Sequence, residues 1–137
     1  MEKLHKSIAE IAARNDEAVN QIEVQHILIA FRGTGTGTAE NRTREEAEQI
    51  TADLLEKINA GEDFDALVKA HTNDSHPGIY GMVLSGSGDQ SKGIYPRRGM
   101  VPAFGNVGWK LKVGEVGVAP HDAATSPYGW HIIKRLK

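Results

Sequence analysis

Cysteine is absent from this chain of 137 residues, and no continuous apolar run approaches the length of a membrane-spanning helix. Without cysteine there is no disulfide, no thiolate zinc site and no thiol nucleophile, and a spanning helix needs about 20 apolar residues. Positive charge is not in excess either, because 16 lysines and arginines stand against 18 aspartates and glutamates. We therefore expect neither a nucleic-acid partner nor a membrane span.

The N-terminus has no continuous apolar segment of the kind that a secretory signal contains. A domain cut from a longer secreted protein would look the same, so the compartment stays open. It is cytoplasmic if the chain is complete, and extracytoplasmic if the chain is part of a secreted protein. The length suits one domain with its own core, and we expect a monomer without cofactor or metal.

The strongest strand signal is Ile22–Arg32, a β-branched and aliphatic run that is ended by glycines. Two-residue periodicity divides its side chains between two faces. One face carries Ile22, Val24, His26, Leu28 and Ala30, and the other carries Glu23, Gln25, Ile27, Ile29 and Phe31. Both faces are apolar from His26 onward, so we expect a central strand covered on both sides. The stretch Gly129–Leu136 repeats the arrangement with His131.

Residues 1–20 show helical periodicity, with Leu4, Ile8, Ile11 and Ala12 on one face and an expected helix end at Asn15-Asp16. We expect a helical extension docked on a domain that covers residues 21–137. The remaining elements, in chain order, are a helix over 43–60 that starts at a Thr43–Glu46 capping box, a shorter helix from about Asp63 to His71, short strands at 79–84 and 93–95, a helix over 102–111, and strands at 116–119 and 129–136. This order predicts an α+β fold with an antiparallel or mixed sheet.

Two segments contain residues typical of a ligand site, one for phosphate and one for a metal, but their spacing does not fit either site. Gly33-Thr-Gly-Thr-Gly-Thr38 lacks the Gly-Lys-Ser/Thr ending of a phosphate-binding loop and no helix follows at once, so we expect a flexible loop. His71, Asp74 and His76 lie in one turn-rich segment, which makes a metal site an alternative. Their spacing matches no helical pair of metal-binding histidines, so we expect incidental surface histidines.

Six short motifs occur in order from about residue 22 to the C-terminus. They are Val24-Gln-His-Ile-Leu28, Ala60-Gly-Glu-Asp-Phe-Asp-Ala-Leu67, Asn73-Asp-Ser75, Arg98-Gly-Met-Val-Pro-Ala-Phe104, Leu111-Lys-Val-Gly-Glu-Val116 and Tyr128-Gly-Trp-His-Ile-Ile-Lys134. Together they resemble the parvulin (rotamase) family of peptidyl-prolyl cis–trans isomerases. The resemblance implies a small four-stranded antiparallel sheet surrounded by helices, with the two histidine-bearing strands adjacent at its centre.

The resemblance also implies roles for particular side chains. His26 and His131 match paired histidines beneath the active site, and Asp74 falls where members carry an aspartate or cysteine that faces the substrate. Ser126 matches a hydroxyl linked to the histidines, and Thr72 is a candidate for the same network.

Met100 and Phe104 match the apolar pair that grips the proline ring, and their four-residue spacing puts them on one helix face. The family's Gly-Asp-Leu-Gly motif, whose leucine completes the pocket, is replaced by Ser91-Lys-Gly-Ile-Tyr95. We therefore expect Ile94, Tyr95 or Leu84 to supply the third wall.

The implied activity is rotation about Xaa-Pro bonds in unfolded or flexible chains, so the partners are proline-containing polypeptides. No bond breaks in this reaction; the imide twists over a barrier of ~18–20 kcal/mol. Members that select phosphorylated sites carry a basic cluster after the first strand, where this chain has only Arg32, so we expect no phosphate direction. The alternative is a catalytically weak parvulin-like chaperone or peptide-binding module.

Overall fold

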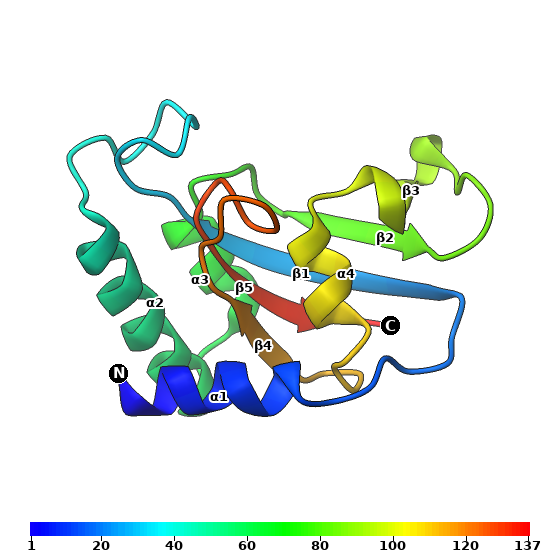
Figure 1. Ribbon diagram of the computed structural model, residues 1–137, viewed down its shortest axis with the longest axis horizontal. Coiled ribbons are helices and arrows are strands. Elements are labelled where there is room, and N and C mark those ends of the chain that lie inside the picture. Colours follow the sequence, from blue (N-terminus) through cyan, green and yellow to red (C-terminus); the bar gives the residue numbers. More distant parts are fainter.

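The computed structural model describes residues 1–137 and contains a five-stranded sheet of order β3-β2-β1-β5-β4 (Figure 1). The strands are β1 (Gln21–Ile29), β2 (Ile79–Val83), β3 (Ile94–Pro96), β4 (Val116–Ala119) and β5 (Trp130–Arg135). The two histidine-bearing strands, β1 and β5, pair antiparallel at the centre, with β2 beside β1 and β4 beside β5, both also antiparallel. The α+β class and the adjacent central strands are confirmed.

The sheet differs from the expected four antiparallel strands at one edge, where β3 runs parallel to β2. The chain between them folds back through a short 3₁₀ helix, Gln90–Lys92, which Asp89 caps. Asp89 also forms an isolated bridge with Ile94, and the Gly81 amide donates to the Gly93 carbonyl. This return lets β3 approach the edge of β2 in the same direction, so the sheet is mixed.

Four α-helices surround the sheet: α1 (Glu2–Ala12), α2 (Arg44–Asn59), α3 (Phe64–His71) and α4 (Pro102–Gly108). The predicted capping box is present, since the Thr43 hydroxyl accepts from the Glu46 amide and the Glu46 carboxylate accepts from the Thr43 amide, both at 3.1 Å. The first helix is shorter than residues 1–20. Residues 13–20 instead form a connection held by Trp109, whose carbonyl accepts from the Glu17 amide and whose indole donates to the Val19 carbonyl.

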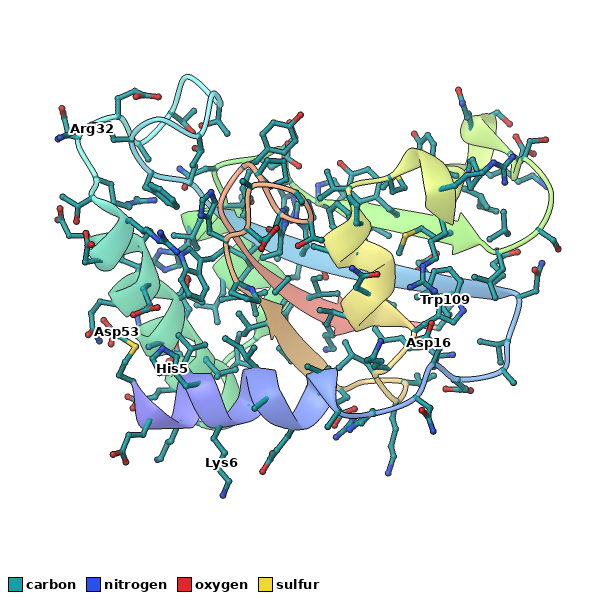
Figure 2. All side chains as sticks on the ribbon, viewed as in Figure 1. His5, Lys6, Asp16, Arg32, Asp53 and Trp109 are labelled. Atoms are coloured by element: carbon teal, nitrogen blue, oxygen red, sulfur yellow. The ribbon has the colours of Figure 1, made fainter.

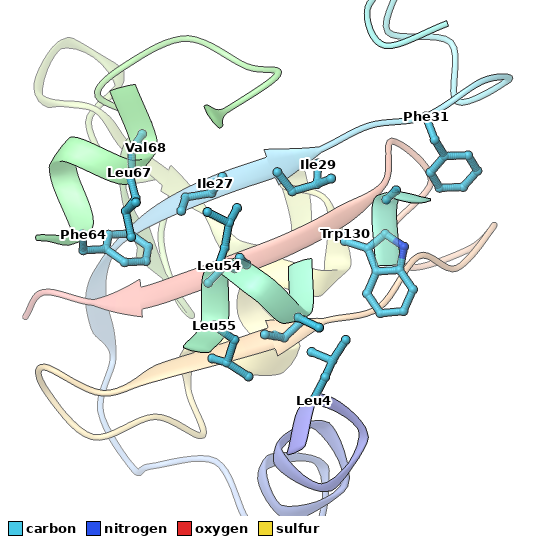
Figure 3. Packing of buried hydrophobic residues seen from close by; sticks show 14 residues of the cluster. Leu4, Ile27, Ile29, Phe31, Leu54, Leu55, Phe64, Leu67, Val68 and Trp130 are labelled. Atoms are coloured by element: carbon cyan, nitrogen blue, oxygen red, sulfur yellow. The ribbon is translucent and has the colours of Figure 1, made fainter. Parts of the chain in front are cut away.

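The helices α2 and α3 cover one face of the sheet, and Figure 3 shows their side chains packed on it. From the strands, Ile27 and Ile29 of β1 and Ile132 of β5 are completely buried in this cluster. These residues of β1 belong to one of the two faces that the sequence alternation predicted. The prediction of a central strand covered on both sides is confirmed, because α4 packs over the other face.

On the opposite face, α4 lies close against β1. A Cβ added at Gly108 would come within 2.8 Å of Ile22 and 3.3 Å of Val24, so the helix depends on a glycine at this position. Phe104, one helical turn earlier, is 5% exposed and belongs to the same cluster. The close approach of α4 fixes where Phe104 stands over the sheet. No helix in the chain has both the length and the apolar composition that crossing a membrane requires.

The helix α1 packs beside β4 at the sheet edge, and its Leu4 belongs to the α2–α3 cluster with 1% exposure (Figures 1 and 3). We expect Leu4→Ala to lower the free energy of unfolding by about 2–4 kcal/mol, because it removes buried methyl groups and leaves a cavity. Urea unfolding measures the change. Lys3→Ala, an exposed neighbour on the same helix, is the matched control and should stay within about 0.5 kcal/mol. The division at residue 20 stays a prediction, and equal stabilities of the two variants would support a detachable extension.

Candidate active site

A cavity of about 590 Å³ opens over the central strands on the side of α4. Its floor is formed by His26, Leu28 and His131, its walls by Tyr80, Tyr95, Met100, Val101 and Phe104, and its rim by Thr36, Asn73, Asp74, Gly99 and Tyr128. None of these residues is a lysine or an arginine. The cavity is therefore mainly apolar and aromatic, with one carboxylate at its edge.

The floor brings the two predicted histidines together. Leu28 pairs with His131 and His26 with Ile133 in the β1–β5 register, so the two imidazoles are diagonal neighbours on one face. Their Nδ1 atoms are 3.1 Å apart, and each residue is 2% exposed. Sequence alternation predicted the face that His26 occupies, and strand register places His131 against it.

Asp74 lies at the edge of this floor, where one of its carboxylate oxygens is 3.2 Å from His26 Nε2. The hydrogen bond from His26 lowers the pKa of Asp74 below its usual value, although partial burial acts in the opposite direction. An ionised Asp74 accepts only, so His26 carries its proton on Nε2. When both rings are neutral, His26 Nδ1 then accepts from His131 Nδ1, and His131 Nε2 is left as a buried acceptor without a partner. The carboxylate thus fixes the tautomers of both rings.

Burial lowers the pKa of His131 to about 3, and positive charge on His26 acts in the same direction. This value lies below that of an unfolded histidine, about 6.5, so between the two the unfolded chain binds more protons. Stability is therefore expected to fall as pH drops, by about 2 kcal/mol from this group between about pH 7 and about pH 5. Urea unfolding measures the loss, and an NMR titration should find the His131 ring neutral at about pH 5.

A second histidine contributes with the same sign, since burial also lowers the pKa of His121. The control is His121→Gln, which should retain most of the pH dependence. An imidazole of His131 that titrates near the ordinary value of about 6.5 contradicts the prediction.

The backbone of β1 holds the loop that carries Asp74. The Thr72 hydroxyl accepts from the Leu28 amide at 3.1 Å and from the Asp74 amide at 3.2 Å. The Asn73 amide donates to the Leu28 carbonyl, and its side-chain oxygen accepts from the Ala30 amide at 3.0 Å. Thr72, predicted as a candidate member of the histidine network, does not line the cavity; its hydroxyl fixes the position of Asp74 instead.

Ser126 is completely buried, and its hydroxyl donates to the Gly129 carbonyl at 2.7 Å. Gly129 has φ of 142° and lies tightly against the backbone of Ile29, where a side chain would collide. The hydroxyl has no hydrogen bond to His26 or His131 in this structure. Ser126 therefore shapes the turn that leads into β5, and its predicted link to the histidines is absent from these contacts.

The apolar pair predicted from the motif lies in the cavity. Phe104 meets His26 edge to face, with ring centroids 4.8 Å apart and planes at 81°. Met100 borders the same space from the segment before α4. An aromatic ring and a flexible thioether form an adaptable apolar surface.

The third wall comes mainly from Tyr80, which the sequence prediction missed. Its ring centroid is 5.8 Å from that of Phe104 and 6.1 Å from that of Tyr95. Of the three predicted candidates only Tyr95 lines the cavity; Ile94 packs on Gly81, and Leu84 is 47% exposed. Ile94 and Leu84 therefore do not form the third wall. The counterpart of the Gly-Asp-Leu-Gly motif lies earlier in the chain than these two residues.

A signal for Tyr80 was present in the sequence. Gly78-Ile-Tyr-Gly81 keeps the Gly-x-x-Gly spacing of the family's motif and follows Asn73-Asp-Ser75 closely. Its last three residues start β2, beside β1, and Tyr80 takes the place of the leucine in the Gly-Asp-Leu-Gly motif. Burial raises the pKa of Tyr80, as does the negative charge of Asp74, so the phenol stays protonated.

The structure also places the two segments that were considered as metal and phosphate sites. His76 Nε2 is 2.9 Å from an Asp65 carboxylate oxygen, whereas Asp74 contacts His26, and no group of three or more potential ligands is arranged to hold a metal ion. The Gly33–Thr38 segment follows β1 and brings Thr36 to the cavity rim. Its glycines at 33, 35 and 37 all have positive φ.

This fold, with an apolar cavity over two hydrogen-bonded histidines on adjacent central strands, defines a domain of the parvulin class. Residues 6–137 match the model of the PPIC-type PPIASE domain. The chain belongs to this family of peptidyl-prolyl cis–trans isomerases, as the motifs indicated.

Named relatives agree with this assignment. The chain is 33% identical over 117 residues to chaperone SurA of Pseudomonas fluorescens, a match that covers 85% of this chain and 23% of the relative. It is 36% identical over 87 residues to foldase protein PrsA of Geobacillus kaustophilus, covering 64% of this chain and 27% of the relative. This chain thus spans about a quarter of the length of these relatives.

A solved structure shares the fold. The peptidyl-prolyl isomerase ESS1 from Candida albicans superposes with a TM-score of 0.61 at 23% identity, covering 99% of this chain and 76% of that one. At this identity the likeness supports the architecture of the sheet and helices.

Proposed function

We propose that this domain catalyses rotation about Xaa-Pro bonds in unfolded or flexible polypeptides and is not phosphate-directed. The observation that carries the proposal is the cavity itself. Met100 and Phe104 line it together with the Asp74 carboxylate, above two buried imidazoles. An apolar notch of this kind suits a pyrrolidine ring.

Rotation requires the site to favour the twisted imide over the planar one. In the planar imide, resonance moves negative charge onto the carbonyl oxygen, and twisting returns part of that charge to the nitrogen. A carboxylate near the oxygen therefore repels the planar form more than the twisted form. Asp74, whose side chain is 39% exposed and faces the cavity, is the group that we assign to this effect.

The two histidines of the cavity floor hold this carboxylate in place through hydrogen bonds. His26 donates to Asp74 and is itself held by His131, so the pair fixes the position of the negative charge. Neither ring is assigned a proton transfer to the substrate, because rotation breaks no bond. Both are positioning residues, and Thr72 and Ser126 support the loops around them.

The cavity gives no basic group for a phosphate on the residue before proline. Its lining contains neither lysine nor arginine, and Arg32, the basic residue that follows β1, donates from Nε to the Glu40 carbonyl. The negative charge of Asp74 would also repel a phosphate nearby. These contacts support substrates without phosphate at that position.

A protease-coupled assay on a chromogenic tetrapeptide tests the proposal. We expect catalysed isomerisation of an Ala-Pro peptide at a rate that rises linearly with protein concentration. Its phosphoserine-Pro counterpart should show no higher kcat/KM. A faster phosphorylated peptide would overturn the part of the proposal that concerns phosphate.

A peptide-binding chaperone is the second candidate, because an exposed tyrosine, Tyr128, extends the aromatic lining onto the outer surface. It predicts suppression of aggregation of an unfolded, proline-free protein, with no rate enhancement on the tetrapeptide. Measuring both activities on one preparation separates the candidates.

A further inference from the structure

A second pocket lies next to the proposed proline site and shares Met100 with it. Its volume is about 330 Å³, and it is bounded by Leu84, Arg97, Arg98, Met100, Pro102 and Asn106. No acidic residue lines it. A polypeptide whose proline sits against Met100 and Phe104 would pass this pocket with a residue close to the proline.

The two arginines of this pocket differ in how their charge is used. Arg97 donates to an Asp16 carboxylate at 2.9 Å, and its guanidinium lies 4.8 Å from the centroid of the Trp109 ring. Figure 2 shows Asp16 and Trp109 side by side near the end of α4. Asp16 also accepts from Lys110 Nζ at 2.9 Å, so Arg97 is paired with a shared carboxylate and held as part of the framework.

Arg98 is exposed and has no carboxylate within salt-bridge distance. Its one hydrogen bond to the protein runs from Nη1 to the Gly86 carbonyl, at 3.3 Å. A guanidinium has five N–H donors and takes a carboxylate bidentately. Most donors of Arg98 therefore remain free for a ligand, at the mouth of a pocket without negative charge.

The outer wall of the pocket comes from the segment between β2 and β3. Leu84 lines the pocket, and Gly86 supplies the carbonyl that holds Arg98. The segment is itself anchored, because the Ser85 amide and hydroxyl both donate to the Asn20 side-chain oxygen, at 3.0 and 2.9 Å. This glycine-rich segment does not line the proline site, but it forms the outer wall of the second pocket and holds Arg98.

We propose that this pocket is a substrate subsite for an acidic side chain, aspartate or glutamate, within three residues of the proline. The inference rests on the proposed isomerase activity and adds a sequence preference to it. A carboxylate is favoured over a phosphate because only one guanidinium is free, and one arginine pairs fully with one carboxylate.

The test uses peptides with a single proline in which Glu or Gln is scanned over three positions on each side, with kcat/KM from NMR exchange. At one position the Glu peptide should be faster than the Gln peptide by about three- to fivefold, the upper part of the range of an exposed ion pair. This ratio should fall towards one in Arg98→Gln, persist in part in Arg98→Lys, and decrease with added salt. The matched control is Lys57→Gln, which removes one positive charge from the distant helix α2 and should keep the ratio.

Each other outcome rejects the subsite. If the native chain shows no preference for Glu at any position, or if Arg98→Gln keeps the preference, the pocket does not read substrate charge. A phosphoserine peptide that exceeds the Glu peptide at the same position assigns the pocket to phosphate and overturns the carboxylate. A failure of the isomerase proposal is distinguishable, because the native chain would then isomerise neither the Glu nor the Gln peptides.

Discussion

Asp74→Ala is expected to lower kcat/KM on a proline tetrapeptide by about tenfold to a hundredfold, or about 1.4–2.8 kcal/mol of transition-state stabilisation. The carboxylate is the one acidic group that lines the cavity, and the hydrogen bond from His26 fixes it there. Removing it abolishes the repulsion that disfavours the planar imide. Asp74→Asn, which keeps the shape and removes the charge, should lose most of the same activity.

The control for Asp74→Ala is an aspartate whose side chain only caps a turn. Asp89 accepts from the amide and the hydroxyl of Ser91 and does not line the cavity. Asp89→Ala should therefore leave kcat/KM unchanged. An unchanged kcat/KM in Asp74→Ala rejects the catalytic assignment and leaves Asp74 with a role in its turn alone.

His26→Leu is expected to reduce stability and turnover together. The ring contacts Asp74 through one nitrogen and His131 through the other, and it lies against Phe104. A leucine leaves the His131 Nδ1–H without an acceptor, although His131 Nε2 already lacks a partner. One newly buried, unsatisfied polar group costs about 1–3 kcal/mol, so we expect a loss of about 1–3 kcal/mol of stability. Freed from its donor, Asp74 should also lose its fixed orientation, with kcat falling at least tenfold, or about 1.4 kcal/mol.

Urea unfolding and the tetrapeptide assay on the same His26→Leu sample provide the measurement. His5→Leu is the control, because His5 is an exposed histidine whose charged contact, with Glu48 at 3.5 Å, lies on the surface. It should change stability by less than about 0.5 kcal/mol. A His26→Leu chain that melts at the native temperature yet has no activity would show that the imidazole acts directly in turnover.

The sequence was most informative where the physics is local. Alternation along Ile22–Arg32 assigned the buried aliphatic side chains of β1 to the correct faces, and the Thr43–Glu46 capping box marked the start of α2. Both features depend on neighbours within a few residues, so tertiary contacts have little power to change them. The motif that contains Met100 and Phe104 likewise indicated the family, and the four-residue spacing predicted that these two side chains lie on one side.

Contacts between distant segments decided the rest. Tyr80 was missed because its place beside Phe104 depends on the register of β2 against β1. The strand at 93–95 was predicted, but its parallel pairing with β2 was not, because the chain returns to the sheet through a long segment. Ser126 is the exception, because a local contact decided it: its hydroxyl donates to the Gly129 carbonyl, three residues along the chain, and not to a histidine.

By itself, the sequence determined the order of the elements, the apolar faces and the family. Only the tertiary structure determined how Tyr80 and Tyr95 meet in the cavity wall, which arginine is free and how far burial lowers the pKa of His131. The physical reason is the separation along the chain between the groups that interact. Periodicity and capping act over a few residues of chain, whereas burial, strand register and charge pairing depend on groups that only folding brings together.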